Sequence, residues 1–262
     1  MARIYTICSS SRGNSVFIGT RGHGILVDAG CSFRSLKSAL SLIDTDILGI
    51  EAIFITHEHR DHIKGLELIV RQTKIPIFAT KKTAEAIKAA GKIPNDTPVY
   101  DSRVGYKSAA FEVSCFKTSH DSADSVGYKV HYGEETFGVC TDTGIVTPET
   151  AKALLSCRTV FLESNHDVEM LRLNPNYHAD LKRRILSDVG HLSNDVCAEF
   201  AEKLVRNGTR NLILGHLSQE NNTPERAAGC TRRFLESKGL FEERDYTLSV
   251  APVTTNGEFV AV

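Results

Sequence analysis

The chain has 262 residues, of which 41% are hydrophobic, so it is long enough to bury a substantial core. Its 31 Lys and Arg residues are balanced by 32 Asp and Glu residues, and the resulting net charge of −1 excludes a global basic field that would attract nucleic acid. The seven dispersed cysteines, and the absence of a leader or an apolar run long enough to cross a bilayer, predict a cytoplasmic protein with reduced thiols and no membrane partner.

The first predicted elements are two strands, Ile4 to Cys8 and Val16 to Ile18, joined by a serine-rich loop. The loop reads Ser9-Ser10-Ser11-Arg12-Gly13-Asn14, and its hydroxyls and guanidinium are suited to binding phosphate, with Ser10, Ser11 and Asn14 as the expected substrate contacts. The same residue types also form ordinary turns. The residues alone leave both interpretations open.

A buried strand over residues 52–56 is predicted to lead into His57-Glu58-His59-Arg60-Asp61-His62, followed by an amphipathic helix from Ile63 to Arg71. Residues two apart in an extended segment point to the same side, so His57 and His59 are able to converge on one cation. Asp61 and His62, at the entrance of the helix, face another way. A single histidine is usually not a ligand, but four ligand-type residues in six positions indicate a metal site.

Further apolar strands each end at a ligand-type residue. They cover residues 111–116, 136–140 and 211–215, and they lead to His120, Asp142 and His216, respectively. Helices are predicted from Lys81 to Ala90 after Thr80, from Ser193 to Arg206 with Ser193 as its cap, and from Glu225 to Leu235 after Thr223-Pro224. The pattern indicates that metal ligands come from the ends of several strands.

Another strand begins at Val160 and ends at Glu163, and His191 directly precedes the helix from Ser193. A carboxylate in such a position can simply cap the next helix or lie in solvent. His191 is then a histidine at the entry of a helix and not a core residue. His166 follows in the same segment. It either contacts a phosphate of the substrate or has no part in the function, and the residues leave both possibilities open.

These motifs, in this order, resemble those of the metallo-β-lactamase fold hydrolases. The resemblance spans nearly the whole chain and implies an α/β (α+β) fold, a four-layer αββα sandwich of two mixed sheets flanked by helices, here expected as one domain over residues 1–262. It implies two divalent metal ions, one held by His57, His59 and His120 and the other by Asp61, His62 and His216. It also implies that Asp142 bridges the two ions and that Asp28 supports the metal loop, residues 57–62. Zn²⁺ or Mn²⁺ is expected rather than redox iron, because the di-iron branch has Glu where this chain has His59.

A more specific resemblance is to the small bacterial YycJ/WalJ family, in the runs over residues 9–14, 162–167 and 184–194. It implies a metal-dependent exonuclease that digests DNA from its 5′ end. Glu163 and His191 are similar in position to a pair that protonates the leaving oxygen in ribonuclease Z. One departure is Cys8, which precedes the serine loop where the family has small residues such as Gly.

We therefore expect a dinuclear phosphodiesterase, in which a metal-bridging hydroxide attacks phosphorus and Asp61, Glu163 and His191 are the catalytic residues. The expected partner is nucleic acid, in particular DNA ends. One alternative is an RNA or small-molecule phosphodiesterase. A thiolester or lactone hydrolase on the same metal site would be indifferent to loss of His191, and a metal-loaded binding module would hold DNA ends without cutting them.

Overall fold

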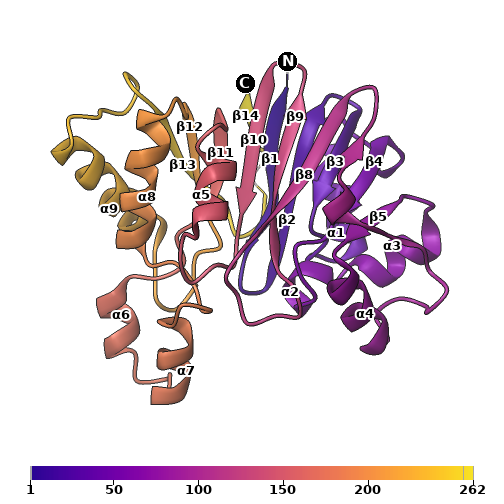
Figure 1. Ribbon diagram of the computed structural model, residues 1–262, viewed down its shortest axis with the longest axis horizontal. Helices are drawn as coiled ribbons and strands as arrows, with labels where there is room; N and C mark the ends of the chain where they lie inside the picture. The colour runs from indigo at the N-terminus through magenta and orange to yellow at the C-terminus, as the bar shows by residue number, and fades with distance from the viewer. Residues whose placement is uncertain (1, 256, 262) are drawn as a thin grey trace. The chain divides into compact units, whose positions relative to one another are not determined.

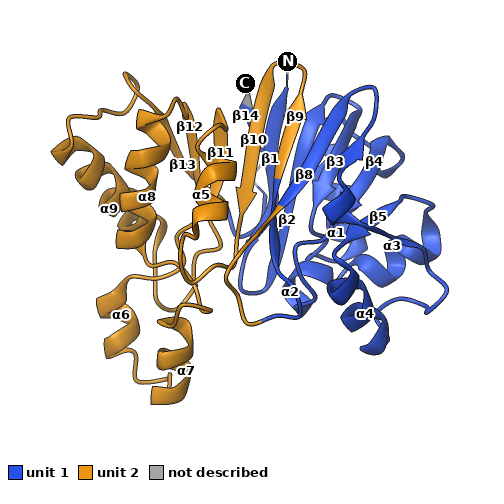
Figure 2. Ribbon diagram, in the orientation of Figure 1, with its two compact units in different colours: residues 1–115, 122–128, 252–262 blue, residues 116–121, 129–251 orange. Residues whose placement is uncertain are grey.

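The computed structural model describes residues 2–255 and 257–261 (Figure 1). The chain divides into two compact units (Figure 2). The first unit comprises residues 1–115, 122–128 and 252–262, and the second comprises residues 116–121 and 129–251. No helix among the described residues is long and apolar enough to cross a membrane.

The first unit contains the N-terminal strands and the first four helices. Its elements are β1 (Arg3–Ser10), β2 (Gly13–Thr20), β3 (His23–Val27), α1 (Phe33–Ser41), β4 (Ile50–Phe54), α2 (Arg60–Ile63), α3 (Leu66–Gln72), β5 (Ile77–Ala79), α4 (Lys81–Ala89), β6 (Val99–Asp101), β7 (Tyr106–Lys107) and β14 (Val260–Ala261). Two short 3-10 helices cover Ile47–Gly49 and Ser102–Val104. The strands β8 (Phe111–Lys117) and β9 (Val126–Tyr132) carry the chain from one unit to the other.

The second unit alternates strands and helices. Its elements are β10 (Glu135–Cys140), α5 (Pro148–Leu154), β11 (Thr159–Glu163), α6 (Val168–Leu173), α7 (Ala179–Ile185), α8 (Asn194–Arg206), β12 (Asn211–Gly215), α9 (Pro224–Ser237) and β13 (Thr247–Val250). The described strands of the whole chain form two seven-stranded sheets, ordered β14-β1-β2-β3-β4-β5-β6 and β13-β12-β11-β10-β9-β8-β7. Both sheets combine parallel and antiparallel pairs, which confirms the predicted mixed sheets.

Parallel strands in register place the ends of neighbouring strands side by side. In the first unit, Val27 of β3 lies opposite Phe54 of β4, so the residues that follow these two strands are neighbours. In the second unit, Cys140 pairs with Leu162, and Glu163 pairs with Gly215. Loops at the carboxyl ends of parallel strands are where α/β sheets place their ligands.

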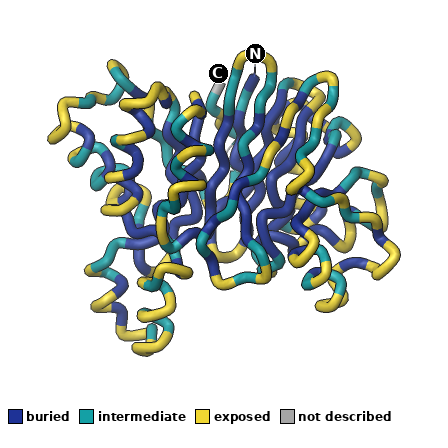
Figure 3. The backbone as a smooth tube through the Cα atoms, viewed as in Figure 1, coloured by how far each residue is buried: buried dark blue, intermediate teal, exposed yellow. Residues whose placement is uncertain are grey.

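The core of each unit lies between its strands and the inner faces of its helices, and Figure 3 shows the strands largely buried and the helices exposed on one side. All five residues of β11 are buried, as expected for a parallel strand covered on both faces. Helix α1, which was not predicted, begins at Ser32, whose side chain accepts a hydrogen bond from the Ser35 amide. Its buried Leu36 and Leu40 join the core of the first unit.

The predicted helix from Ile63 to Arg71 is wrong in its first turn. Helix α2 already ends at Ile63, and α3 begins only at Leu66. Between them, the Gly65 amide donates a hydrogen bond to the Ala29 carbonyl at 2.8 Å. A Cβ atom at Gly65 would lie 2.4 Å from the Cys31 carbonyl oxygen, so the close approach of this backbone interrupts the helix.

The serine-rich loop is shorter than its sequence suggests. Strand β1 continues to Ser10, which pairs with Gly13 of β2, so that only Ser11 and Arg12 form the turn. The Asn14 side chain holds this hairpin by donating a hydrogen bond to the Ser10 carbonyl at 2.9 Å. Residues that composition assigns to a loop therefore belong to the sheet.

Helix α8 tests which residues stabilise the second unit. Ser193 caps it as predicted, with its hydroxyl accepting from the Val196 amide. Val196, whose spacing along the helix is that of a core residue, is 38% exposed, whereas Leu204 is fully buried. We expect Leu204→Ala to lower the free energy of unfolding by about 2–5 kcal/mol. The control, Val196→Ala, should change this free energy by less than about 0.5 kcal/mol. Urea denaturation measures both values. Equal losses in the two variants would contradict this packing.

Candidate metal centre

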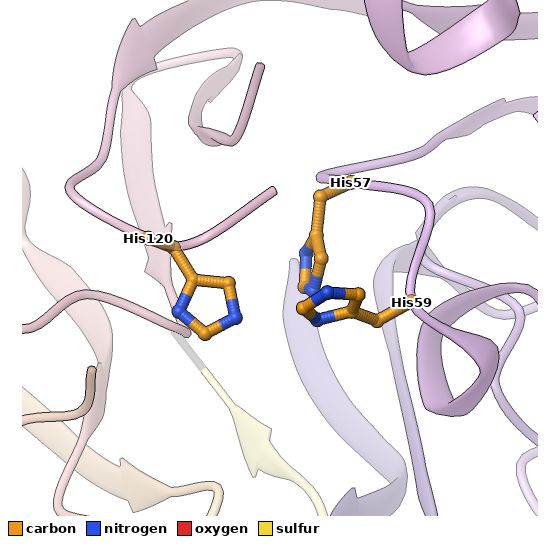
Figure 4. Close-up of side chains that lie close together, drawn as sticks. All are labelled: His57, His59 and His120. Carbon is orange, nitrogen blue, oxygen red and sulfur yellow. The ribbon is translucent and has the colours of Figure 1, made fainter. Parts of the chain in front are cut away.

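In the first unit, three imidazoles lie close together in the segment that runs from the end of β4 through α2. They belong to His57, His59 and His62. His57 and His62 are fully buried. The ring centroids of His57 and His62 lie 4.1 Å apart. Those of His57 and His59, which are labelled in Figure 4, lie 4.6 Å apart. Asp61 lies beside them, with one carboxylate oxygen 3.5 Å from Nε2 of His62. Buried imidazoles with an adjacent carboxylate are a donor set that suits Zn²⁺ and other first-row divalent ions.

Asp28 and Thr56 fix the orientation of His62. The His62 Nδ1 atom donates to the Asp28 carboxylate at 2.7 Å, and that carboxylate also accepts from the Thr56 amide at 2.8 Å. Burial raises the pKa of Asp28, while the contacts with His62 and Thr56 oppose that rise. Because Nδ1 is occupied in this way, Nε2 of His62 is the ring nitrogen that a metal ion would use. Asp28 has the contacts expected of a supporting carboxylate, and its role in metal binding stays a prediction.

Asp28→Asn is expected to lower the metal affinity of the protein by roughly 10–100-fold, because the amide cannot orient His62 as the carboxylate does. Titration of the metal-free protein with Zn²⁺ against a chromogenic chelator measures this affinity. Asp96→Asn, at an exposed carboxylate of the same unit, is the control. An unchanged affinity in Asp28→Asn would show that Asp28 does not support the metal loop.

Asn14 touches the metal loop, a contact that the sequence did not indicate. Its amide nitrogen lies 3.2 Å from a carboxylate oxygen of Asp61 and 3.1 Å from Nε2 of His62. Asn14 and Ser10 are buried, whereas Ser11 is exposed. Of the three predicted substrate contacts, Ser11 is thus the residue presented to solvent, and Asn14 is placed to position Asp61.

The second unit gathers Asp142, Glu163, His191 and His216, each of which offers one ligand atom within 4.8 Å of the others. The in-register ends of β10, β11 and β12 explain this, because Asp142, Glu163 and His216 lie at or just after those ends. Asp142 and His216 both have a backbone φ of 54°, in the left-handed region that residues other than glycine rarely adopt. Such strain costs about 1–3 kcal/mol and is concentrated at functional sites.

Glu163 is fully buried and saturated with hydrogen bonds. One oxygen accepts from the amides of Thr143 at 2.9 Å and Leu192 at 3.2 Å, and the other lies 2.7 Å from Nδ1 of His191. Burial acts to raise the pKa of Glu163, but the contacts with His191 and His216 lower it overall. A solvated or helix-capping role for this carboxylate is therefore excluded.

The two neighbouring histidines, His191 and His216, both favour the charged form. Burial disfavours the charged form of His191, yet the Glu163 carboxylate raises its pKa above the ordinary value. Burial also acts against charge on His216, but Asp142 and Glu163 raise its pKa to about 10. Positions that hold a proton this strongly favour positive charge, which a divalent ion would supply in place of the proton. The donor set of the second unit therefore also fits a metal.

His120 and His166 are neutral buried imidazoles. Nδ1 of His120 lies 3.1 Å from the Gly190 carbonyl, which leaves Nε2 for a metal, and burial lowers the pKa of this ring. His120 is the third residue labelled in Figure 4 and follows β8. For His166, burial lowers the pKa to about 4, and neither ring nitrogen has a hydrogen-bond partner among the described residues. An uncharged ring attracts phosphate weakly, and its predicted contact with substrate stays a prediction.

Comparisons with known proteins bear on this site. Residues 23–217 match a family model described as a beta-lactamase superfamily domain. The chain is 37% identical to "Exodeoxyribonuclease YycJ" of Bacillus anthracis, with 89% of each chain covered, and 36% identical to "Exodeoxyribonuclease WalJ" of Streptococcus pneumoniae, with 84% of this chain and 83% of the relative covered. It is also similar to the solved metallo-beta-lactamase fold protein YhfI of Bacillus subtilis, with a TM-score of 0.68, 15% identity and coverage of 97% and 98%. The last likeness confirms the predicted fold class.

Proposed function

Because the chain belongs to the β-lactamase superfamily and is therefore a metal-dependent hydrolase, we propose that its two groups of ligands form one dinuclear site that cleaves phosphodiester bonds in DNA. In this proposal the two units act as a single catalytic domain. One metal ion is held by His57, His59 and His120, the other by Asp61, His62 and His216, and Asp142 contributes to both. Zn²⁺ and Mn²⁺ suit this imidazole-rich set.

Divalent ions bound there would activate a water molecule and stabilise negative charge on phosphate oxygens. The residues of this chain prepare the site for them. Asp28 and Asn14 hold His62 and Asp61 in place, and the Gly190 carbonyl orients His120. The contacts at Nδ1 leave Nε2 of His62 and of His120 as the ring nitrogens that would bind metal, and the Asn14 amide lies beside Nε2 of His62 at 3.1 Å.

The single observation that carries the proposal is the 2.7 Å contact between Nδ1 of His191 and the Glu163 carboxylate. Glu163 is fully buried, whereas 19% of the His191 side chain is exposed, so a proton can leave the pair only from His191. Burial opposes charge on this ring, but the Glu163 carboxylate raises the pKa of His191 and so favours its protonated form. We infer that His191 donates a proton to the leaving oxygen and that Glu163 positions and charges it.

A competing arrangement would have Asp142, Glu163, His191 and His216 bind a metal within the second unit alone. The hydrogen bonds of Glu163 argue against it. One of its oxygens is engaged by two backbone amides and the other by His191, so neither is directed at a separate cation. Glu163 is better suited to support a histidine than to bind metal.

The DNA substrate is supported by the relatives of this chain. Both bacterial relatives are named exodeoxyribonucleases, and the similarity extends over more than four fifths of their lengths. Digestion from the 5′ end and a cytoplasmic location are part of the proposal. The metal-site chemistry is shared with enzymes that act on other esters, so the substrate class needs a direct test.

The test is digestion of a 5′-phosphorylated DNA duplex, labelled at one end, by purified protein loaded with Mn²⁺. We expect progressive loss of nucleotides from the 5′ end. An Asp142→Ala sample prepared in parallel excludes contaminating nucleases. Cleavage of RNA or thiolesters without cleavage of DNA would contradict the proposed substrate, and degradation from the 3′ end would contradict the proposed direction.

A further inference from the structure

Next to Asp61, the first unit has a pocket of about 300 Å³. Its lining residues are Ser11, Arg12, Arg60, Asp61 and Lys64. They come from separate parts of the unit: Ser11 and Arg12 form the turn between β1 and β2, Arg60 is the first residue of α2, and Lys64 follows the last. The pocket therefore directly adjoins a proposed metal ligand.

The three cations of this pocket are Arg12, Arg60 and Lys64. Among the described residues, no carboxylate forms an ion pair with Arg12, Arg60 or Lys64, and all three side chains are exposed. Two other arginines of the unit are paired with carboxylates: Arg71 lies 2.9 Å from Glu67, and Arg103 lies 3.0 Å from Asp124. Three positive charges against the one carboxylate of Asp61 give the pocket lining a net positive charge, which a bound anion would balance.

The chemistry of the lining selects phosphate. Guanidinium groups match the oxygens of a phosphate with two parallel hydrogen bonds, an ammonium group adds a point charge, and the Ser11 hydroxyl is a further donor. The net charge of the chain is only −1, so attraction of a polyanion must be local. This pocket supplies such a local positive charge beside the metal loop.

We propose that Arg12, Arg60 and Lys64 bind a phosphate group of the nucleic-acid substrate, next to the phosphate that is cleaved. This inference rests on the proposed function for the identity of the substrate. The bound group is either an internal phosphodiester or the terminal 5′-phosphate. Both present the same anionic oxygens, and only the terminal group is absent from a 5′-hydroxyl strand.

The test uses metal-free protein, so that binding is measured apart from catalysis. Fluorescence anisotropy in EDTA gives the Kd of a labelled single-stranded oligonucleotide for the wild type and for the triple variant Arg12→Gln, Arg60→Gln, Lys64→Gln. We expect the Kd to rise roughly tenfold. The slope of log affinity against log salt should fall by about 0.7 for each phosphate contact that is lost. Lys82→Gln, an exposed cation of the same unit outside the pocket, is the control and should bind like the wild type.

The two sources of phosphate are separated by comparing 5′-phosphorylated and 5′-hydroxyl strands. A loss in the triple variant with both strands identifies an internal phosphodiester, and a loss with the phosphorylated strand alone identifies the terminal group. Equal affinities of the wild type and the triple variant for both strands would overturn the inference. If the pocket binds as proposed but metal-loaded protein never cuts DNA, the proposed function fails and the phosphate site stands.

Discussion

His191→Gln is expected to lower kcat for DNA cleavage by roughly 10²–10⁴-fold, the usual contribution of a positioned general acid, while the protein keeps its full metal content. The reason is that glutamine cannot donate the proton that His191 holds through its contact with Glu163. Steady-state kinetics on labelled DNA, together with metal analysis of the same preparation, measure both effects. His178→Gln, at an exposed histidine of the same unit, is the matched control.

The proton-donor role has a second readout. With bis(p-nitrophenyl) phosphate the leaving group is already stable as an anion, so it needs no proton, and His191→Gln should retain most of the wild-type rate. Glu163→Gln should shift the alkaline limb of the pH–rate profile, where the proton donor is lost, to lower pH, because the carboxylate raises the pKa of His191. Equal losses of His191→Gln on DNA and on the activated ester, or loss of metal from this variant, would contradict the assignment.

Asp142→Asn is expected to reduce bound metal and to lower the cleavage rate by roughly 10³-fold or more. Asp142 is almost fully buried and lies 3.2 Å from His216, and the proposal assigns it to both metal ions. An amide has no negative charge to share between two cations. Metal analysis after gel filtration should find fewer than two ions per chain.

The matched control is Asp180→Asn, which removes an exposed carboxylate from the same unit. It should keep wild-type metal content and rate. If Asp142→Asn retained two metal ions and cut DNA at the wild-type rate, Asp142 would have no part in the site. Cleavage restored by high Mn²⁺ would instead indicate that the carboxylate mainly sets metal affinity.

Much of each half of the site was predictable because strand ends carry the chemistry. An apolar run such as residues 211–215 identifies a buried strand, and the next residue, His216, must then lie at the sheet edge. The same reasoning predicted Glu163 at the end of β11 and His57 near the end of β4. The contact between Glu163 and His191 joins segments 28 residues apart, and strand periodicity alone does not predict it.

Other features depend on tertiary contacts that no local pattern contains. The break at Gly65 arises from the backbone of Cys31, more than thirty residues earlier in the chain. Val196 has the spacing of a core residue, but the packing of α8 leaves it exposed. The contact of Asn14 with Asp61 and the grouping of Arg12 with Lys64 also join distant segments. Periodicity identifies which residues share a face, not which segments meet there.

The central claim is that ligands from both units hold two metal ions, and anomalous diffraction from crystals of the Mn²⁺- or Zn²⁺-loaded protein tests it most directly. We predict two peaks, one contacted by His57, His59 and His120, the other by Asp61, His62 and His216, with Asp142 touching both. A single peak bound only by Asp142, Glu163, His191 and His216 would contradict the dinuclear site and the role of His191 as proton donor.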